Sequence, residues 1–98
     1  MSVNSGTRFQ VAQDVQARAF HEELVLLDLS RGEYFSLDAV GAKVWEGLRN
    51  GQSVGDVVTF VAAAYDTDVA RVEADVKRLV DELVAHRLLV PLNGDAVK

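Results

Sequence analysis

The hydrophobic pattern of this chain changes its period near the middle. Residues 23–29, ELVLLDL, form an almost continuous apolar run, which is typical of a strand buried on both faces. Residues 33–37, EYFSL, alternate as a second strand does, and the intervening SRG places Gly32 where a hairpin needs a positive φ. The pattern predicts a β-hairpin over residues 23–37. A weaker pattern in residues 8–15, RFQVAQDV, predicts one strand before it.

Directly after the hairpin the apolar residues take up helical spacing. Asp38 is the predicted N-cap of this first helix, which ends where Asn50 or Gly51 adopts the left-handed conformation. The apolar residues of the helix are Val40, Val44, Trp45 and Leu48. We expect this face, including the indole of Trp45, to point inward against the strands.

Two further helices are marked by their caps. Ser53 with Asp56 three residues later predicts a capping box at the start of the second helix. DTD at residues 66–68 ends that helix and is predicted to cap the third, which spans about residues 69–86. The apolar seam of the third helix is predicted at Val69, Val72, Val76, Leu79 and Leu83.

The order of these elements predicts a small α+β protein. Three N-terminal antiparallel strands precede three helices, and the tight turn between the last two helices gives a winged helix-turn-helix-like arrangement. We expect a single domain over residues 1–98, with a core from about 8 to 91, flexible ends and a frayed tail at 93–98. A chain of 98 residues builds only one modest core.

The amino-acid composition excludes several kinds of protein. The chain has no cysteine, which excludes disulfides and thiolate metal sites. No apolar run approaches the roughly 20 residues of a membrane-spanning helix. The N-terminal MSVNSGTRFQ lacks the apolar segment of a signal peptide. We therefore expect a cytoplasmic protein with no membrane partner.

No residue pattern typical of catalysis is present in the sequence. The two histidines, His21 and His86, lie far apart and lack the i, i+4 spacing of a metal-binding helix. There is no glycine-rich phosphate loop, nucleophile elbow or Cys-His pair. We expect no enzyme activity, no metal site and no cofactor, and we interpret His86 as a cation near a helix C-terminus.

The charge distribution argues against DNA, the obvious partner of a winged helix. The net charge is −5, and the ten basic residues are scattered. The third helix, in the place of a recognition helix, carries Arg71, Lys77 and Arg78 against Glu73, Asp75, Asp81 and Glu82. Because phosphate neutralisation supplies much of a DNA reader's affinity, we expect no nucleic-acid partner. A DNA-binding winged-helix protein remains the alternative hypothesis, and a purely structural subunit is a third.

The strand of residues 33–37 has little protection at its edge. Proteins normally blunt such an edge with charge, proline or a bulge, and EYFSL has only Glu33 for this purpose. An exposed edge beside an apolar helix seam suits the capture of a peptide as an added strand. The side chains also have a purely structural explanation, in which Phe35 and Leu37 are core residues and Tyr34 is a surface aromatic. We therefore take the backbone edge of the strand as the functional candidate. Without a peptide, the edge can pair with a second copy and form a homodimer.

A resemblance to a known family is carried by two segments, LVLLDLSRGEYFSLDAVGAKVWEGLRNGQSVGDVV and VKRLVDELVAHRLL. They are similar to the PqqD-like family, the leader-peptide recognition elements of pathways that make ribosomally synthesised, post-translationally modified peptides. The resemblance covers about residues 8–91. It implies three strands, three helices and binding of a precursor's leader peptide as a strand added to the third strand. It also implies a partner enzyme, such as a radical SAM protein in pyrroloquinoline quinone biosynthesis or a cysteine-type leader peptidase in lasso-peptide pathways.

Applied to this sequence, the resemblance assigns the peptide-binding residues. The edge strand contributes Glu33, Tyr34, Phe35, Ser36 and Leu37. The third helix walls the groove with Val72, Asp75, Val76 and Leu79. One departure stands at the end of that helix, where many members have glycine and this chain has Arg87. A left-handed cap at a non-glycine residue costs about 1 kcal/mol.

Overall fold

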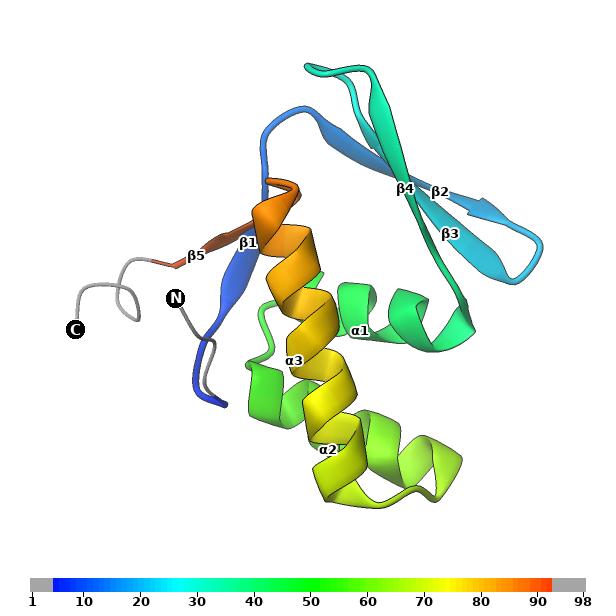
Figure 1. The fold of residues 1–98 in the computed structure, drawn as a ribbon, viewed down its shortest axis with the longest axis vertical. Helices are drawn as coiled ribbons and strands as arrows, with labels where there is room; N and C mark the ends of the chain where they lie inside the picture. Colours follow the sequence, from blue (N-terminus) through cyan, green and yellow to red (C-terminus); the bar gives the residue numbers. More distant parts are fainter. Residues whose placement is uncertain (1–4, 93–98) are drawn as a thin grey trace.

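The computed structural model describes residues 5–92, which form a helical half below a three-stranded sheet (Figure 1). The strands are β1 (Phe9–Val11), β2 (Val15–Phe20), β3 (Glu23–Asp28), β4 (Glu33–Leu37) and β5 (Leu89–Pro91). The helices are α1 (Ala39–Arg49), α2 (Val54–Tyr65) and α3 (Val69–Ala85). An antiparallel sheet of order β2-β3-β4 precedes the three helices, so the predicted α+β class is confirmed. The tail expected at residues 93–98 lies outside the described residues.

The hairpin of β3 and β4 is the predicted one, and Asp28 organises its turn. Gly32 has a φ of 71°, as the turn requires. The side chain of Asp28 accepts hydrogen bonds from the Ser30 hydroxyl at 2.8 Å and from the backbone N–H groups of Ser30 and Arg31. These bonds favour the ionised carboxylate and lower the pKa of Asp28 below its ordinary value of 3.8, the Ser30 hydroxyl having the largest effect. The turn therefore fixes where β4 begins.

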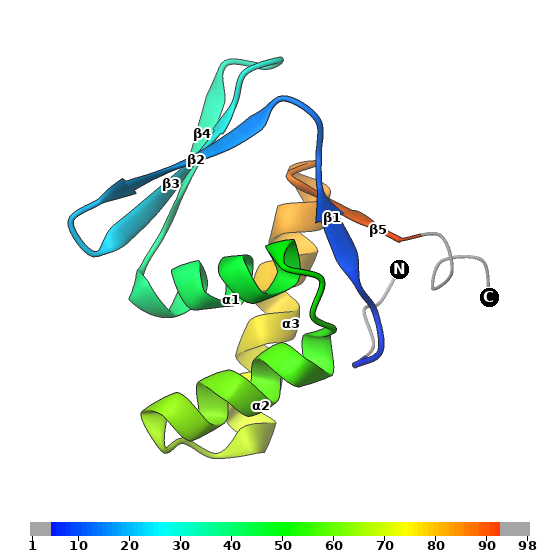
Figure 2. The same ribbon diagram turned by 180° about the vertical axis from the view of Figure 1, so that it is seen from behind.

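The prediction that β3 is buried on both faces is wrong. Leu24 and Leu26 are buried, whereas the alternate residues Val25 and Leu27 are only half-buried. The sheet packs on the helices with one face, and α1 lies between the sheet and α2 in both views (Figure 1, Figure 2). Residues of the other face are therefore covered only in part.

The prediction of one strand over residues 8–15 is also wrong. The segment is divided by Asp14, whose φ of 66° breaks the extended backbone. The part before the break is β1, which pairs antiparallel with β5, a strand that the sequence pattern did not predict. The part after it begins β2, which continues to Phe20 and supplies the third strand of the main sheet. The two parts of the segment thus join different sheets.

Most predicted helix ends are confirmed by hydrogen bonds. Asp38 Oδ1 accepts from the Gly41 backbone N–H at 2.8 Å at the start of α1. Ser53 and Asp56 form both bonds of a capping box at the start of α2, each 3.2 Å long. Asp68 occupies the N-cap position of α3 but makes no side-chain cap bond, so that part of the prediction is wrong. The Asp38 cap thus sets where α1 begins, directly after β4.

The apolar seam of α3 differs from the prediction at two positions. Its buried residues are Val72, Val76, Val80 and Leu83. Val69 is 54% exposed in the first turn, and Leu79 lies at the border of the core. The reason is that Val80, one turn after Val76, takes the inward position, which turns Leu79 toward β4. Arg87, just after α3, has a φ of 63°, so a non-glycine residue does adopt the left-handed conformation.

The core is a single cluster of buried apolar side chains at the junction of the helices and the main sheet. Trp45 is 1% exposed within it, which confirms the predicted orientation of α1. Val44 and Leu48 are equally buried, whereas Val40, also predicted to point inward, is 39% exposed, so the prediction is wrong at that position. The position of α1 under the sheet is thus held by large side chains close to the end of β4.

Candidate functional site

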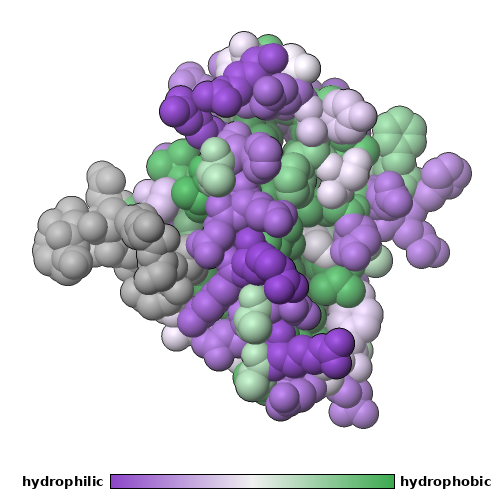
Figure 3. Space-filling model, in the orientation of Figure 1, coloured by the Kyte–Doolittle hydropathy of each residue, from purple (hydrophilic) through white to green (hydrophobic). Residues whose placement is uncertain are grey.

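An unpaired strand edge and an apolar helix face border the same groove. The strand order β2-β3-β4 leaves one side of β4 without a partner among the described strands. On that side a groove of about 470 Å³ lies between β4, the N-terminal half of α1 and α3. Figure 3 shows hydrophobic surface there, beside the hydrophilic outer face of α3. Both features of the predicted site are therefore present in one place.

The structure places most of the predicted site residues in this groove. Its lining includes Phe35, Ser36, Leu37, Asp75, Val76 and Leu79. Val72 is a core residue outside this lining, whereas Leu37 and Val76 belong both to the core, with 4% and 3% exposure, and to the lining. Glu33 and Tyr34 lie at the start of β4 and border a separate small depression near His86. The lining thus comes from the second half of β4 and from the middle of α3.

Further lining residues were not predicted from the sequence. They are Asp38, Val40, Gly41 and Val44 from the start of α1, and Arg78 and Glu82 from α3. Val40 and Val44 are spaced i, i+4, which places them on one helix face next to the strand end. The same spacing relates Arg78 to Glu82. These periodicities are visible in the sequence, but they do not show that both helices face β4.

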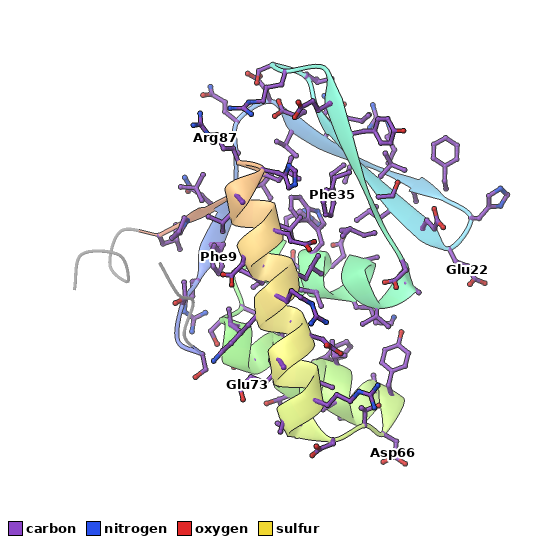
Figure 4. The ribbon with its side chains drawn as sticks, in the orientation of Figure 1. Phe9, Glu22, Phe35, Asp66, Glu73 and Arg87 are labelled. Atoms are coloured by element: carbon purple, nitrogen blue, oxygen red, sulfur yellow. The ribbon has the colours of Figure 1, made fainter. Side chains whose placement is uncertain are left out.

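One ring contact joins β4 to the end of α3. The rings of Phe35 and His86 have centroids 5.4 Å apart with an interplanar angle of 49°. His86 is the C-cap residue of α3, so its predicted place at the helix C-terminus is confirmed, but the contact with Phe35 was not predicted. Figure 4 shows Phe35 between β4 and the upper part of α3. This contact links the C-terminal end of α3 to a strand residue that lines the groove.

The groove has an apolar floor and a charged border. The apolar side chains are Phe35, Leu37, Val40, Val44, Val76 and Leu79. The charged residues are Asp38, Asp75, Arg78 and Glu82. An Arg78 nitrogen donates to Asp75 at 2.7 Å, and both side chains are more than half exposed. Such a surface suits an extended chain that buries apolar side chains in the floor and pairs its backbone with the strand edge.

Residues 5–92 differ from metal-binding and membrane-spanning proteins in two respects. Within this range, no group of three or more His, Asp or Glu side chains is placed to hold a metal ion. Nor does any helix of the same range have the length and apolar character needed to cross a membrane.

Comparison with known proteins identifies the family. TbiB1, solved in complex with the TbiA(beta) leader peptide, is 34% identical with a TM-score of 0.76, over 82% of this chain and 93% of that one. A lasso peptide synthetase B1 complexed with the leader peptide is 27% identical with a TM-score of 0.80, over 86% of this chain and 99% of that one. No curated protein matches the sequence significantly. The profile of a family described as coenzyme PQQ synthesis protein D (PqqD) matches residues 23–89. The resemblance found in the sequence is confirmed, and this chain belongs to the PqqD family.

Proposed function

We propose that this protein is a non-catalytic module that binds the leader of a precursor peptide and presents it to a modifying enzyme. The leader is added as a strand to β4, beside α3. The observation that carries the proposal is the groove between the unpaired edge of β4 and the apolar face of α3. Two similar proteins were solved with leader peptides, which supports the same class of ligand here. The enzyme partner is a radical SAM protein or a cysteine-type leader peptidase.

Successive side chains of β4 point to opposite faces of the sheet, so the two sets of side chains have different roles in the proposed binding. The side chains of Phe35 and Leu37 alternate with those of Tyr34 and Ser36 along β4, and Phe35, Ser36 and Leu37 all line the groove. Alternate side chains of an added strand therefore enter the apolar floor, while the others lie beside Tyr34, which is 75% exposed. Backbone hydrogen bonds supply affinity, and the floor selects apolar side chains.

The DNA-binding alternative predicts a different surface on α3. A recognition helix needs basic residues on its exposed face, but the two basic side chains at the middle of α3 are matched by acidic neighbours. Arg78 is paired with Asp75 at 2.7 Å, and Lys77 with Glu73 at 3.2 Å. Binding of duplex DNA with a steep salt dependence would support the alternative and contradict this charge argument.

The binding test uses the labelled TbiA(beta) leader peptide, the ligand in the similar TbiB1 complex, as its probe. Ser36→Pro removes a backbone donor and restricts φ on β4, and we expect it to weaken binding about tenfold or more in fluorescence anisotropy. Ser36→Thr keeps the backbone and should change little. Equal binding by both variants would show that β4 is not the site.

A second pair of variants leaves the sheet untouched. Leu79→Gln places a polar amide in the groove wall and should weaken peptide binding about tenfold, because half-buried apolar area is lost from the contact. Val69→Gln makes a comparable change at a 54% exposed position of the same helix outside the groove, and should bind normally. Equal affinity of the two variants would place the peptide elsewhere. Far-UV circular dichroism checks that all four variants are folded.

A further inference from the structure

The charges around the groove are unequal. Three carboxylates line it, from Asp38, Asp75 and Glu82, against one guanidinium, from Arg78, which leaves a net charge of −2. The whole chain has the same sign of charge, −5. An occupant of this groove therefore enters a negative potential, which attracts cations and repels acidic chains.

The three carboxylates are not equally available to a ligand. Asp75 is engaged by Arg78 at 2.7 Å. Asp38 Oδ1 accepts the N-cap hydrogen bond from Gly41 at 2.8 Å. Glu82, in contrast, has no ion pair within 4.0 Å among the described residues 5–92. Asp38 also has no ion pair among these residues, but its Oδ1 is held by the helix cap, so Glu82 is the groove carboxylate with neither an ion pair nor a cap bond in the described range.

The position of Glu82 relates this charge to the apolar floor. Glu82 lies one turn before His86, whose ring contacts Phe35, so its side chain borders the end of the groove next to Phe35. Leu79, another groove residue, precedes it by three positions on the same helix face. A peptide side chain that enters the floor beside Leu79 has a second side chain on the same face two residues along, about 6.6 Å away, and this second side chain is the one that can reach Glu82.

We propose that the recognised peptide segment is basic as well as apolar, with a lysine or arginine held by Glu82 beside an apolar residue that enters the floor. This inference rests on the proposed peptide-binding function and adds the chemistry that selects among peptides. A partly exposed ion pair of this kind changes affinity by about two- to fivefold, so Glu82 tunes selection while the apolar floor supplies most of the binding. The preference weakens as salt screens the pair.

Selection from random peptides displayed on phage tests the proposal without knowledge of the natural precursor. The full chain is immobilised, and the enriched peptides are sequenced. We expect apolar residues with lysine or arginine enriched at a fixed position two residues away. With Glu82→Lys as the bait, the same position should change to aspartate or glutamate. The matched control is Asp81→Lys, which makes the same charge change at an exposed position of α3 outside the groove lining and should keep the basic preference.

The outcomes separate this inference from the function on which it rests. Enrichment of peptides whose binding is lost in Leu79→Gln, but with no basic preference or no change in Glu82→Lys, overturns the inference and leaves peptide binding in place. The same result follows if Asp81→Lys reverses the preference as strongly as Glu82→Lys, because the effect is then one of overall charge. If no enriched peptide depends on Leu79 or Ser36, the peptide-binding function itself is overturned. A reversal confined to Glu82→Lys supports both proposals.

Discussion

Trp45 gives the sharpest test of the packing that holds α1 against the sheet. It is the only tryptophan of the chain and is 1% exposed. Its indole Nε1 is buried and has no hydrogen-bond partner among the described residues. The side chain therefore combines a large favourable apolar contact with an unfavourable buried donor. Replacing it by alanine and by phenylalanine separates these two contributions.

The two substitutions should differ greatly in their effect on stability. Trp45→Ala removes the whole ring system and leaves a cavity, which costs about 3 to 5 kcal/mol. Trp45→Phe loses only part of the ring, and it also removes an unpaired donor whose burial costs about 1 to 3 kcal/mol. We therefore expect Trp45→Phe to be within about 1 kcal/mol of the wild type. A protein of this size has about 5 to 15 kcal/mol of stability, so the alanine variant loses a large share.

Urea unfolding followed by far-UV circular dichroism measures both variants, since each lacks the fluorophore. With a slope of about 1 to 3 kcal/mol per molar urea, Trp45→Ala should lower the midpoint by about 1 M or more. A loss in Trp45→Phe close to that of Trp45→Ala would contradict the reasoning, because the retained ring and the removal of an unpaired donor should together offset most of the lost packing. In the wild type, the fluorescence maximum should be blue-shifted and move to the red on unfolding. A native spectrum like that of tryptophan in water would mean that α1 presents its other face.

Three further substitutions test the turns and helix ends. Arg87→Gly should raise stability by about 1 kcal/mol, seen as a higher melting temperature, because a φ of 63° is strained for arginine and not for glycine. Asp28 has a folded-state pKa below 3.8, so its stabilising effect is present above that value and is lost as the pH falls through the folded-state pKa. Asp28→Asn should therefore flatten the acid side of the stability–pH profile. Gly47→Ala should cost about 1 to 3 kcal/mol in urea unfolding, because its Cβ would lie 2.8 Å from Cγ2 of the buried Val57.

Local signals in the sequence were sufficient for the hairpin and for the helices. The positive φ of Gly32 and the capping box of Ser53 and Asp56 depend on residues within four positions of one another, so their patterns can be read directly. The pairing of β1 with β5 joins Phe9 to Pro91, at opposite ends of the chain. These two short strands come together because the helices between them in the sequence pack into one core. No local sequence pattern predicts their pairing.

The candidate site was predictable in part in both its strand and its helix: Glu33 and Tyr34 of β4 and Val72 of α3 are the predicted residues that do not line the groove. The weak protection of the edge at Glu33 is a property of the strand sequence, and β4 is indeed an edge strand. Which side of α3 faces that edge depends on how the helix rotates in the core. A difference of one residue, Val80 inward instead of Leu79, moves Leu79 into the groove wall while Val72 stays in the core. The period of apolar residues predicts the buried face of a helix to within about one residue. A shift of one residue is enough to change which side chains line a groove, so the period alone does not identify them.

The acidic groups around β4 also bear on self-association, because a homodimer through β4 remains a prediction from its open edge. If two copies paired antiparallel about a two-fold axis at Phe35, Glu33 of each would lie opposite Leu37 of the other and next to Asp38. Like charges brought together on neighbouring strands are destabilising, and the two grooves would add their own negative charges. Charge of this kind is one way in which proteins guard an open strand edge. The carboxylates that we propose to favour a basic peptide on β4 therefore disfavour a second copy there, so we expect the protein to be monomeric at low salt in size-exclusion chromatography and any pairing through β4 to increase with salt.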